Sequence, residues 1–181
     1  MLGLLAATVA LVGRQTVYFP AVGVHSAPVN ALVLISLAFA VTLSVHLHSD
    51  MSDVESSSAR PLWRWEMLQT VVGGLTGVVT FLGLTHVSGA GHLAFGAARD
   101  FLFWLGVALL SGRLLSWELS WVAPVVLALA VGVAGTAPTG HPRPWAVPLL
   151  PADSVPAAAA SGLVLAPGLL VLGRSRATRA R

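Results

Sequence analysis

Side chains that could bind a metal or act in catalysis are few in this sequence of 181 residues, which has six histidines, seven acidic residues and no cysteine. A haem needs two imidazoles at the same depth, and a zinc site needs three or four close ligands. His46 and His48 follow one apolar stretch, whereas His86 and His92 follow the next, on what should be the opposite side of a membrane. We therefore predict no cofactor and no metal site. The alternative is a cluster of the histidines expected on the outer side, which are His25, His86, His92 and His141.

Catalytic motifs are also missing from the sequence. The acidic residues fall in polar stretches or at the ends of apolar ones, and neither a G-x-S-x-G motif nor a G-x-x-x-x-G-K-[ST] phosphate-binding loop occurs. Arg99 and Asp100 begin an apolar stretch, where a carboxylate suits the positive end of a helix dipole. We interpret this pair as a hydrated helix end, with a functional pair as the alternative, and predict that the chain is not an enzyme.

The elements that carry these residues are long apolar stretches. Hydrophobic residues make up 56% and charged residues 9% of the chain, and the mean hydropathy is +0.83. Because a transmembrane helix takes about 20 apolar residues, the length allows about six spans and leaves little for a soluble domain. We predict an all-α, polytopic helical membrane protein with a single transmembrane domain over residues 1–181. The expected spans cover residues 2–19, 28–45, 67–87, 101–115, 121–137 and 156–173, and a basic cytoplasmic tail covers residues 174–181.

The arginines determine the expected orientation. With six spans, seven arginines fall on the side of both termini and two on the other side, so the positive-inside rule predicts cytoplasmic termini. The chain has no Lys, and Asn30, Ile35 and Tyr18 are the single residues of their types, as expected for a high-GC bacterial gene. We therefore expect a multi-pass protein of the bacterial cytoplasmic (inner) membrane. The seven arginines are Arg60, Arg64, Arg113, Arg174, Arg176, Arg179 and Arg181, and the two are Arg99 and Arg143.

Three features of the spans and loops are candidates for function. Arg14 lies inside the first expected span, so it either lines a path or marks a stretch that lies in the interface, which would leave five spans. Gly73 and Gly77 have the G-x-x-x-G spacing of close helix approach, at a path or a packing seam. The proline-rich stretch before the last span contains an apolar run, residues 145–150, which we expect to re-enter the outer leaflet or to pack on the bundle.

The whole arrangement resembles the permease half of ABC-type exporters. The resemblance rests on six spans with both termini inside, on an acidic loop after the second span, and on three stretches: DVESSSARPLWRW, ARDFLFWLGVALLSGRLLSWELSWVAPV and PRPWAVPLLPADS. In that family the loop after the second span docks on the ATPase, and the segment before the last span re-enters the outer leaflet. By this resemblance, the ATPase-docking loop would contain Asp50, Asp53, Glu55, Arg60 and Arg64, and the re-entrant segment would contain Trp145, Leu149 and Leu150.

The resemblance implies a membrane-embedded, permease-like subunit that forms part of an export path and is driven by a separate cytoplasmic ATPase. The expected partners are the lipid bilayer, an ABC ATPase subunit, and either a second copy of the chain or a second permease subunit. The scattered arginines do not form the basic face that a nucleic acid requires, so we expect no nucleic-acid partner. The alternative function is a non-transporting integral membrane scaffold or accessory protein of another membrane complex.

Overall fold

The computed structural model describes residues 15–21, 24–46, 62–87, 89 and 91–174. This described part contains five α-helices and a two-stranded sheet. The helices are α2 (Ala31–His46), α4 (Leu62–Val87), α5 (Ala94–Leu114), α6 (Val122–Ala134) and α7 (Val155–Arg174). The strands are β1 (Thr16–Ala21) and β2 (Val24–Asn30), and the short 3₁₀ helices are η1 (Gly91–Leu93), η2 (Trp117–Leu119) and η3 (Val147–Leu149).

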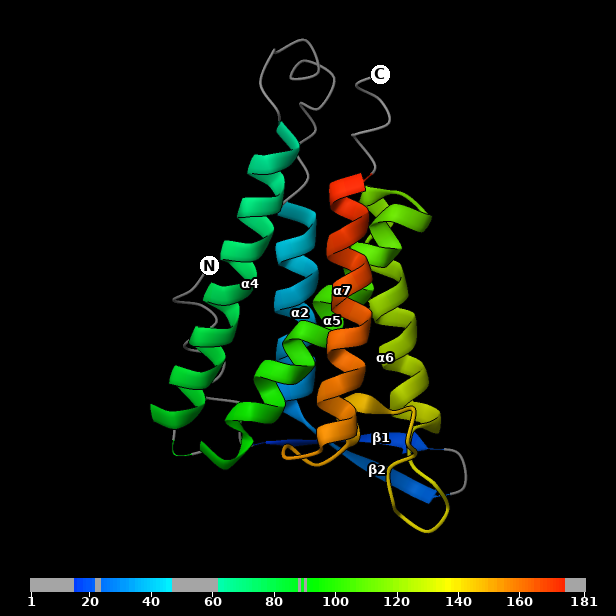
Figure 1. Ribbon diagram of the computed structural model, residues 1–181. Coiled ribbons are helices and arrows are strands. Elements are labelled where there is room, and N and C mark those ends of the chain that lie inside the picture. Colours follow the sequence, from blue (N-terminus) through cyan, green and yellow to red (C-terminus); the bar gives the residue numbers. More distant parts are fainter. Residues whose placement is uncertain (1–14, 22–23, 47–61, 88, 90, 175–181) are drawn as a thin grey trace.

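The helices alternate in direction along the bundle (Figure 1). Helices α2, α5 and α7 start at the end of the bundle where the strands lie, and α4 and α6 run back toward it. We call this the sheet end; it also carries the segment between α6 and α7. The other end, which we call the far end, carries the end of α2, the start of α4, the turn between α5 and α6, and the end of α7.

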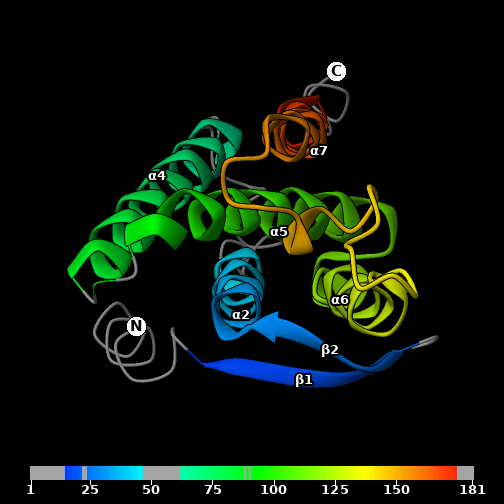
Figure 2. The same cartoon turned by 90° about the horizontal axis from the view of Figure 1, so that it is seen from below.

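Helix α5 forms the centre of the bundle, with α2 and α6 on one side of it and α7 on the other (Figure 2). Its side chains Phe101, Trp104, Leu105 and Leu109 are almost fully buried. The helix packs closely on α7 because Gly106 has no side chain: a Cβ there would lie 2.8 Å from the backbone of Leu165. The side chains of α5 therefore occupy the centre of the bundle in the described residues.

Three of the described helical stretches, 67–87, 91–114 and 117–134, are long and apolar enough to cross a membrane. Two further apolar helical stretches, 31–46 and 155–170, are shorter. The surface of α4 exposes large apolar side chains, including Leu68, Leu75 and Val79. Since a soluble protein rarely exposes such a continuous apolar surface, these helices are compatible with a membrane protein. Six spans and cytoplasmic termini stay predictions.

The start of the chain differs from the expected spans. Residues 16–19, expected at the end of a helical span, belong to strand β1, and residues 28–30, expected at the start of the next span, belong to β2. The strands pair antiparallel, with Thr16 opposite Asn30. Pro20 and Pro28 lack the backbone N–H that a helix interior needs, which favours extended chain here. Helix α2 starts only at Ala31, capped by Asn30, whose Oδ1 accepts the N–H of Leu32 at 2.9 Å. Residues 1–14 lie outside the described part.

The later helices lie close to their expected positions but differ at their starts. Helix α4 starts at Leu62, five residues before the start expected at residue 67. Helix α5 starts at Ala94, not near Phe101, because the small residues of the AFGAAR run can pack as helix against their neighbours. The interpretation of Arg99 and Asp100 as a hydrated helix end is therefore wrong: each residue is 4% exposed.

Candidate functional site

The candidate site is a buried ion pair in the second turn of α5. The Arg99 Nη2 atom lies 2.9 Å from the Asp100 Oδ1 atom, and Arg99 Nε donates a second hydrogen bond to the same oxygen at 3.0 Å. The two side chains are 3% and 5% exposed. A charge that is buried in this way is stable only when it is paired and hydrogen-bonded, and Asp100 supplies the counter-charge from the adjacent position.

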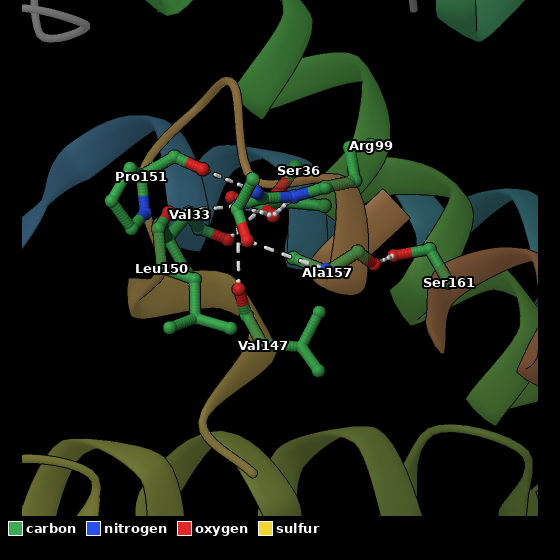
Figure 3. A network of polar contacts seen from close by, with 10 residues as sticks. Val33, Ser36, Arg99, Val147, Leu150, Pro151, Ala157 and Ser161 are labelled. Carbon is green, nitrogen blue, oxygen red and sulfur yellow. Dashed lines mark hydrogen bonds and ion pairs between the residues drawn. The ribbon is translucent and has the colours of Figure 1, made fainter. Parts of the chain in front are cut away.

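Arg99 also binds the segment that precedes α7. Its Nη1 donates to the carbonyl of Pro151 at 2.7 Å, and its Nη2 donates to the carbonyls of Leu150 at 3.1 Å and Val147 at 3.3 Å. Figure 3 shows the guanidinium directed at these carbonyls, which come from η3 and the residues after it. A single side chain of the central helix thus fixes a segment that lies about 50 residues later in the chain, at the sheet end of the bundle.

Within the described residues, two of the three carbonyls also accept a hydrogen bond from a local backbone N–H. The carbonyl of Val147 accepts the N–H of Leu150 at 3.2 Å, and that of Pro151 accepts the N–H of Ser154 at 3.0 Å. Each oxygen has a second lone pair, which Arg99 uses. Because the planar guanidinium carries five N–H donors, it can serve a carboxylate and several carbonyls at once, and a lysine could not.

A cavity of about 230 Å³ lies beside the ion pair and is partly open to the surface. It lies between the start of α2, the first turns of α5 and the segment before α7. Among the described residues, Asp100 accepts hydrogen bonds through Oδ1 alone, so its second oxygen is available to water or a ligand. The lining residues are Asn30, Leu32, Val33, Leu93, Gly96, Ala97, Arg99, Asp100, Pro148, Leu149, Leu150, Pro151 and Ala152.

Trp104, one turn further along α5, is a second buried polar group. It is fully buried, and in the described part of the chain its indole N–H has no hydrogen-bond partner. It lines a crevice of about 10 Å³ between α2, α5 and α6. A space of that size holds at most about one water molecule, and the other lining residues are apolar, so the crevice is no ligand site.

The residues expected in the re-entrant segment lie near the ion pair. Leu149 and Leu150 are half-buried, and Leu150 offers its carbonyl to Arg99, whereas Trp145 is 44% exposed. Gly73 and Gly77 lie further away, on the face of α4 that meets the bundle. A Cβ on Gly73 would lie 2.9 Å from the Leu43 side chain, and one on Gly77 would lie 2.5 Å from the ring of Phe101.

The remaining expected residues fall mostly outside the described part of the chain. Arg64 lies in the first turn of α4, but its side chain is not described. No group of three or more metal-ligating side chains occurs within the described ranges. The residues outside those ranges are Arg14 and the other four of the expected docking loop, Asp50, Asp53, Glu55 and Arg60.

Sequence reasoning missed the partners of Arg99, although one signal was present. Arg99 and Asp100 follow the small residues Gly96, Ala97 and Ala98. Small side chains let another segment of the same chain approach the helix closely, which buries the residues that follow them. The carbonyls that Arg99 binds leave no trace in the sequence, because every residue has one.

No family model matches the chain, and comparison with curated proteins and with solved structures gives no match either.

Proposed function

We propose that the chain is a membrane-embedded, permease-like subunit of an ABC-type exporter, which forms part of an export path and is driven by a separate cytoplasmic ATPase. The observation that carries this proposal is the separation of two features along the bundle. The polar loop between α2 and α4 joins helix ends at the far end, whereas the segment of residues 145–151 packs on α5 at the sheet end. An exporter needs this separation, because ATP acts on one side of the membrane and cargo leaves on the other.

The distribution of arginines supports placing the far end in the cytoplasm. Arg64, Arg113 and Arg174 lie at or near helix ends there, and the basic tail follows Arg174 in sequence. At the sheet end, Arg99 is neutralised by Asp100, which leaves Arg143 as the exposed cation among the described residues of that end. An excess of free arginines marks the cytoplasmic side.

The filled core supports a path formed with another subunit. Helix α5 occupies the centre of the bundle with side chains such as Phe101, Trp104 and Leu109, which favours a path at the surface of the chain over one through its described core. We propose that the path lies between this chain and a second permease subunit, either another copy or a different chain. The chemistry of ATP hydrolysis belongs to the ATPase in this proposal, and the chain itself performs no catalytic step.

The test of this proposal is reconstitution with the candidate ATPase. We expect an ATP-binding-cassette protein to co-purify with the tagged chain in mild detergent, and its ATPase activity to change at least about twofold when the chain is present in liposomes. Failure to recover any ATPase, together with unchanged ATPase activity in the mixture, would contradict the proposal.

The docking role of the acidic loop is tested by a double replacement, D53N/E55Q. Removing both carboxylates should lower recovery of the ATPase several-fold without lowering the amount of chain in the membrane, because the loop lies outside the apolar stretches. The matched control is E118Q, which removes an exposed carboxylate at the same end of the bundle, in η2. Equal recovery of the ATPase by D53N/E55Q and E118Q would rule out the docking role.

A filled core equally favours the second candidate, a non-transporting scaffold of another membrane complex. A scaffold needs no path and would use the exposed apolar surface of α4 and α6 for its partner. Co-purification with a membrane complex that contains no ATP-binding cassette would favour this candidate over the exporter subunit.

A further inference from the structure

We propose that Arg99 is a latch: it holds the segment Val147–Pro151 against α5 beside the cavity at the sheet end, and releasing this segment widens the cavity toward that side of the membrane. The use of such a gate rests on the proposed transport function, since an export path needs an outer closure. The latch itself concerns only this chain, and it is tested below without cargo or ATPase.

Among the described residues, Arg99 makes the hydrogen bonds that join the segment Val147–Pro151 to another helix. The backbone hydrogen bonds of the segment are short-range: Leu150 N–H donates to the Val147 carbonyl, and two others reach the flanking residues Ala146 and Ser154. Apolar contact adds to these, since Val147 is 6% exposed and belongs to the core cluster.

The position of Asp100 allows the latch to open while Arg99 keeps its counter-charge. Asp100 is next to Arg99 on the same helix, so the ion pair remains when the segment moves away. Arg99 and Asp100 line the cavity, so water from the cavity can replace the three carbonyls on the guanidinium. A counter-ion on the moving segment would instead have been lost at release, at a large desolvation cost.

The seat of the segment on α5 is formed by Gly96. A Cβ placed there would lie 3.0 Å from the Cβ of Ala152 and 3.2 Å from its Cα, so the segment and the helix meet closely just where the Arg99 bonds form. Ala152 is partly exposed in the closed segment, and its Cβ faces Gly96, so moving the segment away should expose position 152 further. A cysteine at this position reports release, and the natural chain has no cysteine to interfere.

The experiment measures the rate at which a membrane-impermeant, charged methanethiosulfonate reagent labels A152C in intact cells. The reference is T139C, an exposed position in the same connection between α6 and α7. With Arg99 present, A152C should react at least about tenfold more slowly than T139C. In R99K/A152C the rate should rise at least about tenfold, because one ammonium cannot hold Asp100 and three carbonyls together.

The matched control is R143K, which makes the same change at an exposed arginine of the same connection and should alter neither rate. Labelling of A152C as fast as T139C in the chain with Arg99 would overturn the latch, and so would an unchanged A152C rate in R99K. If R99K does not accumulate in the membrane, R99Q, which keeps two donors, takes its place with the same expected and contradicting results.

A disulfide provides the independent arm. In G96C/A152C, mild oxidation should form a disulfide in most molecules. A third cysteine, A97C, reports access to the cavity. In the cross-linked form, R99K should not raise the labelling rate of A97C. Failure of the cross-link to form would contradict the closed seat.

In the reconstituted exporter, the same cross-link should block ATP-driven transport and reductant should restore it. If no ATPase is recovered but the labelling and cross-linking results are as expected, only the exporter proposal is contradicted. If the cross-linked chain still transports, the gate is contradicted.

Discussion

At the scale of single residues, the buried pair Arg99 and Asp100 joins α5 to the segment before α7 at the sheet end. Asp100 neutralises the charge, and the carbonyls of Val147, Leu150 and Pro151 use the donors that Asp100 leaves free. The pair is costly to bury, so its stability depends on all of these partners being in place. Removing one of the two charges should therefore lower the free energy of unfolding more than removing both.

Replacing Arg99 with alanine should lower the free energy of unfolding in detergent by about 3–5 kcal/mol, because Asp100 is then buried without its counter-charge. The double replacement R99L/D100L should cost less than R99A, since it removes both charges and fills the space with apolar atoms. Chemical denaturation followed by tryptophan fluorescence measures both. A double variant that is less stable than R99A would show that the carbonyl contacts outweigh the buried charge.

At the scale of elements, the fit of α5 against α7 depends on small residues. Gly106 faces the backbone of Leu165, and Gly168 faces Leu109 across the same seam. The two helices approach closely there, and the seam leads directly to the segment that Arg99 holds. A side chain added to this seam should therefore disturb both the packing and the latch.

Replacing Gly106 with alanine should destabilise the chain by about 1–3 kcal/mol, the usual cost of overpacking, because its Cβ would lie 2.8 Å from the Leu165 backbone. The control is G83A on α4, where a Cβ meets nothing within 4 Å, and alanine should there be neutral or stabilising by up to about 1 kcal/mol. Thermal unfolding in detergent compares the two. Equal melting temperatures for G106A and G83A would show that α7 can move off α5 without cost.

At the scale of the whole molecule, the alternating helices divide the described connections between two ends. Ser116, in the turn between α5 and α6, is exposed at the far end, and Thr139 is exposed at the sheet end. If the bundle spans a membrane, these positions face opposite sides. The excess of free arginines at the far end then places Ser116 in the cytoplasm.

The orientation is tested with S116C and T139C as single cysteines. We expect an impermeant thiol reagent to label T139C in intact cells and to label S116C only after the membrane is permeabilised. Labelling of both positions in intact cells would contradict a spanning bundle, and the reverse pattern would invert the orientation and with it the outer position of the latch.

The sequence by itself determined what depends on local composition. The apolar stretches predicted the helices ending near His46, Val87, Leu114, Ala134 and Arg174, because long runs of apolar residues with few charges favour helices. The same reasoning failed for residues 16–19 and 28–30, where the prolines and the pairing of two strands outweighed the apolar character of the chain.

Only the tertiary structure decided the state of Arg99 and Asp100. The sequence favoured a hydrated helix end because a charged pair next to an apolar run normally reaches water. The structure buries the pair because three carbonyls from a segment about 50 residues away complete its hydrogen bonds. Backbone carbonyls have no sequence signature, so a contact of this kind is fixed by how α5 and the segment before α7 come together, and not by either stretch alone.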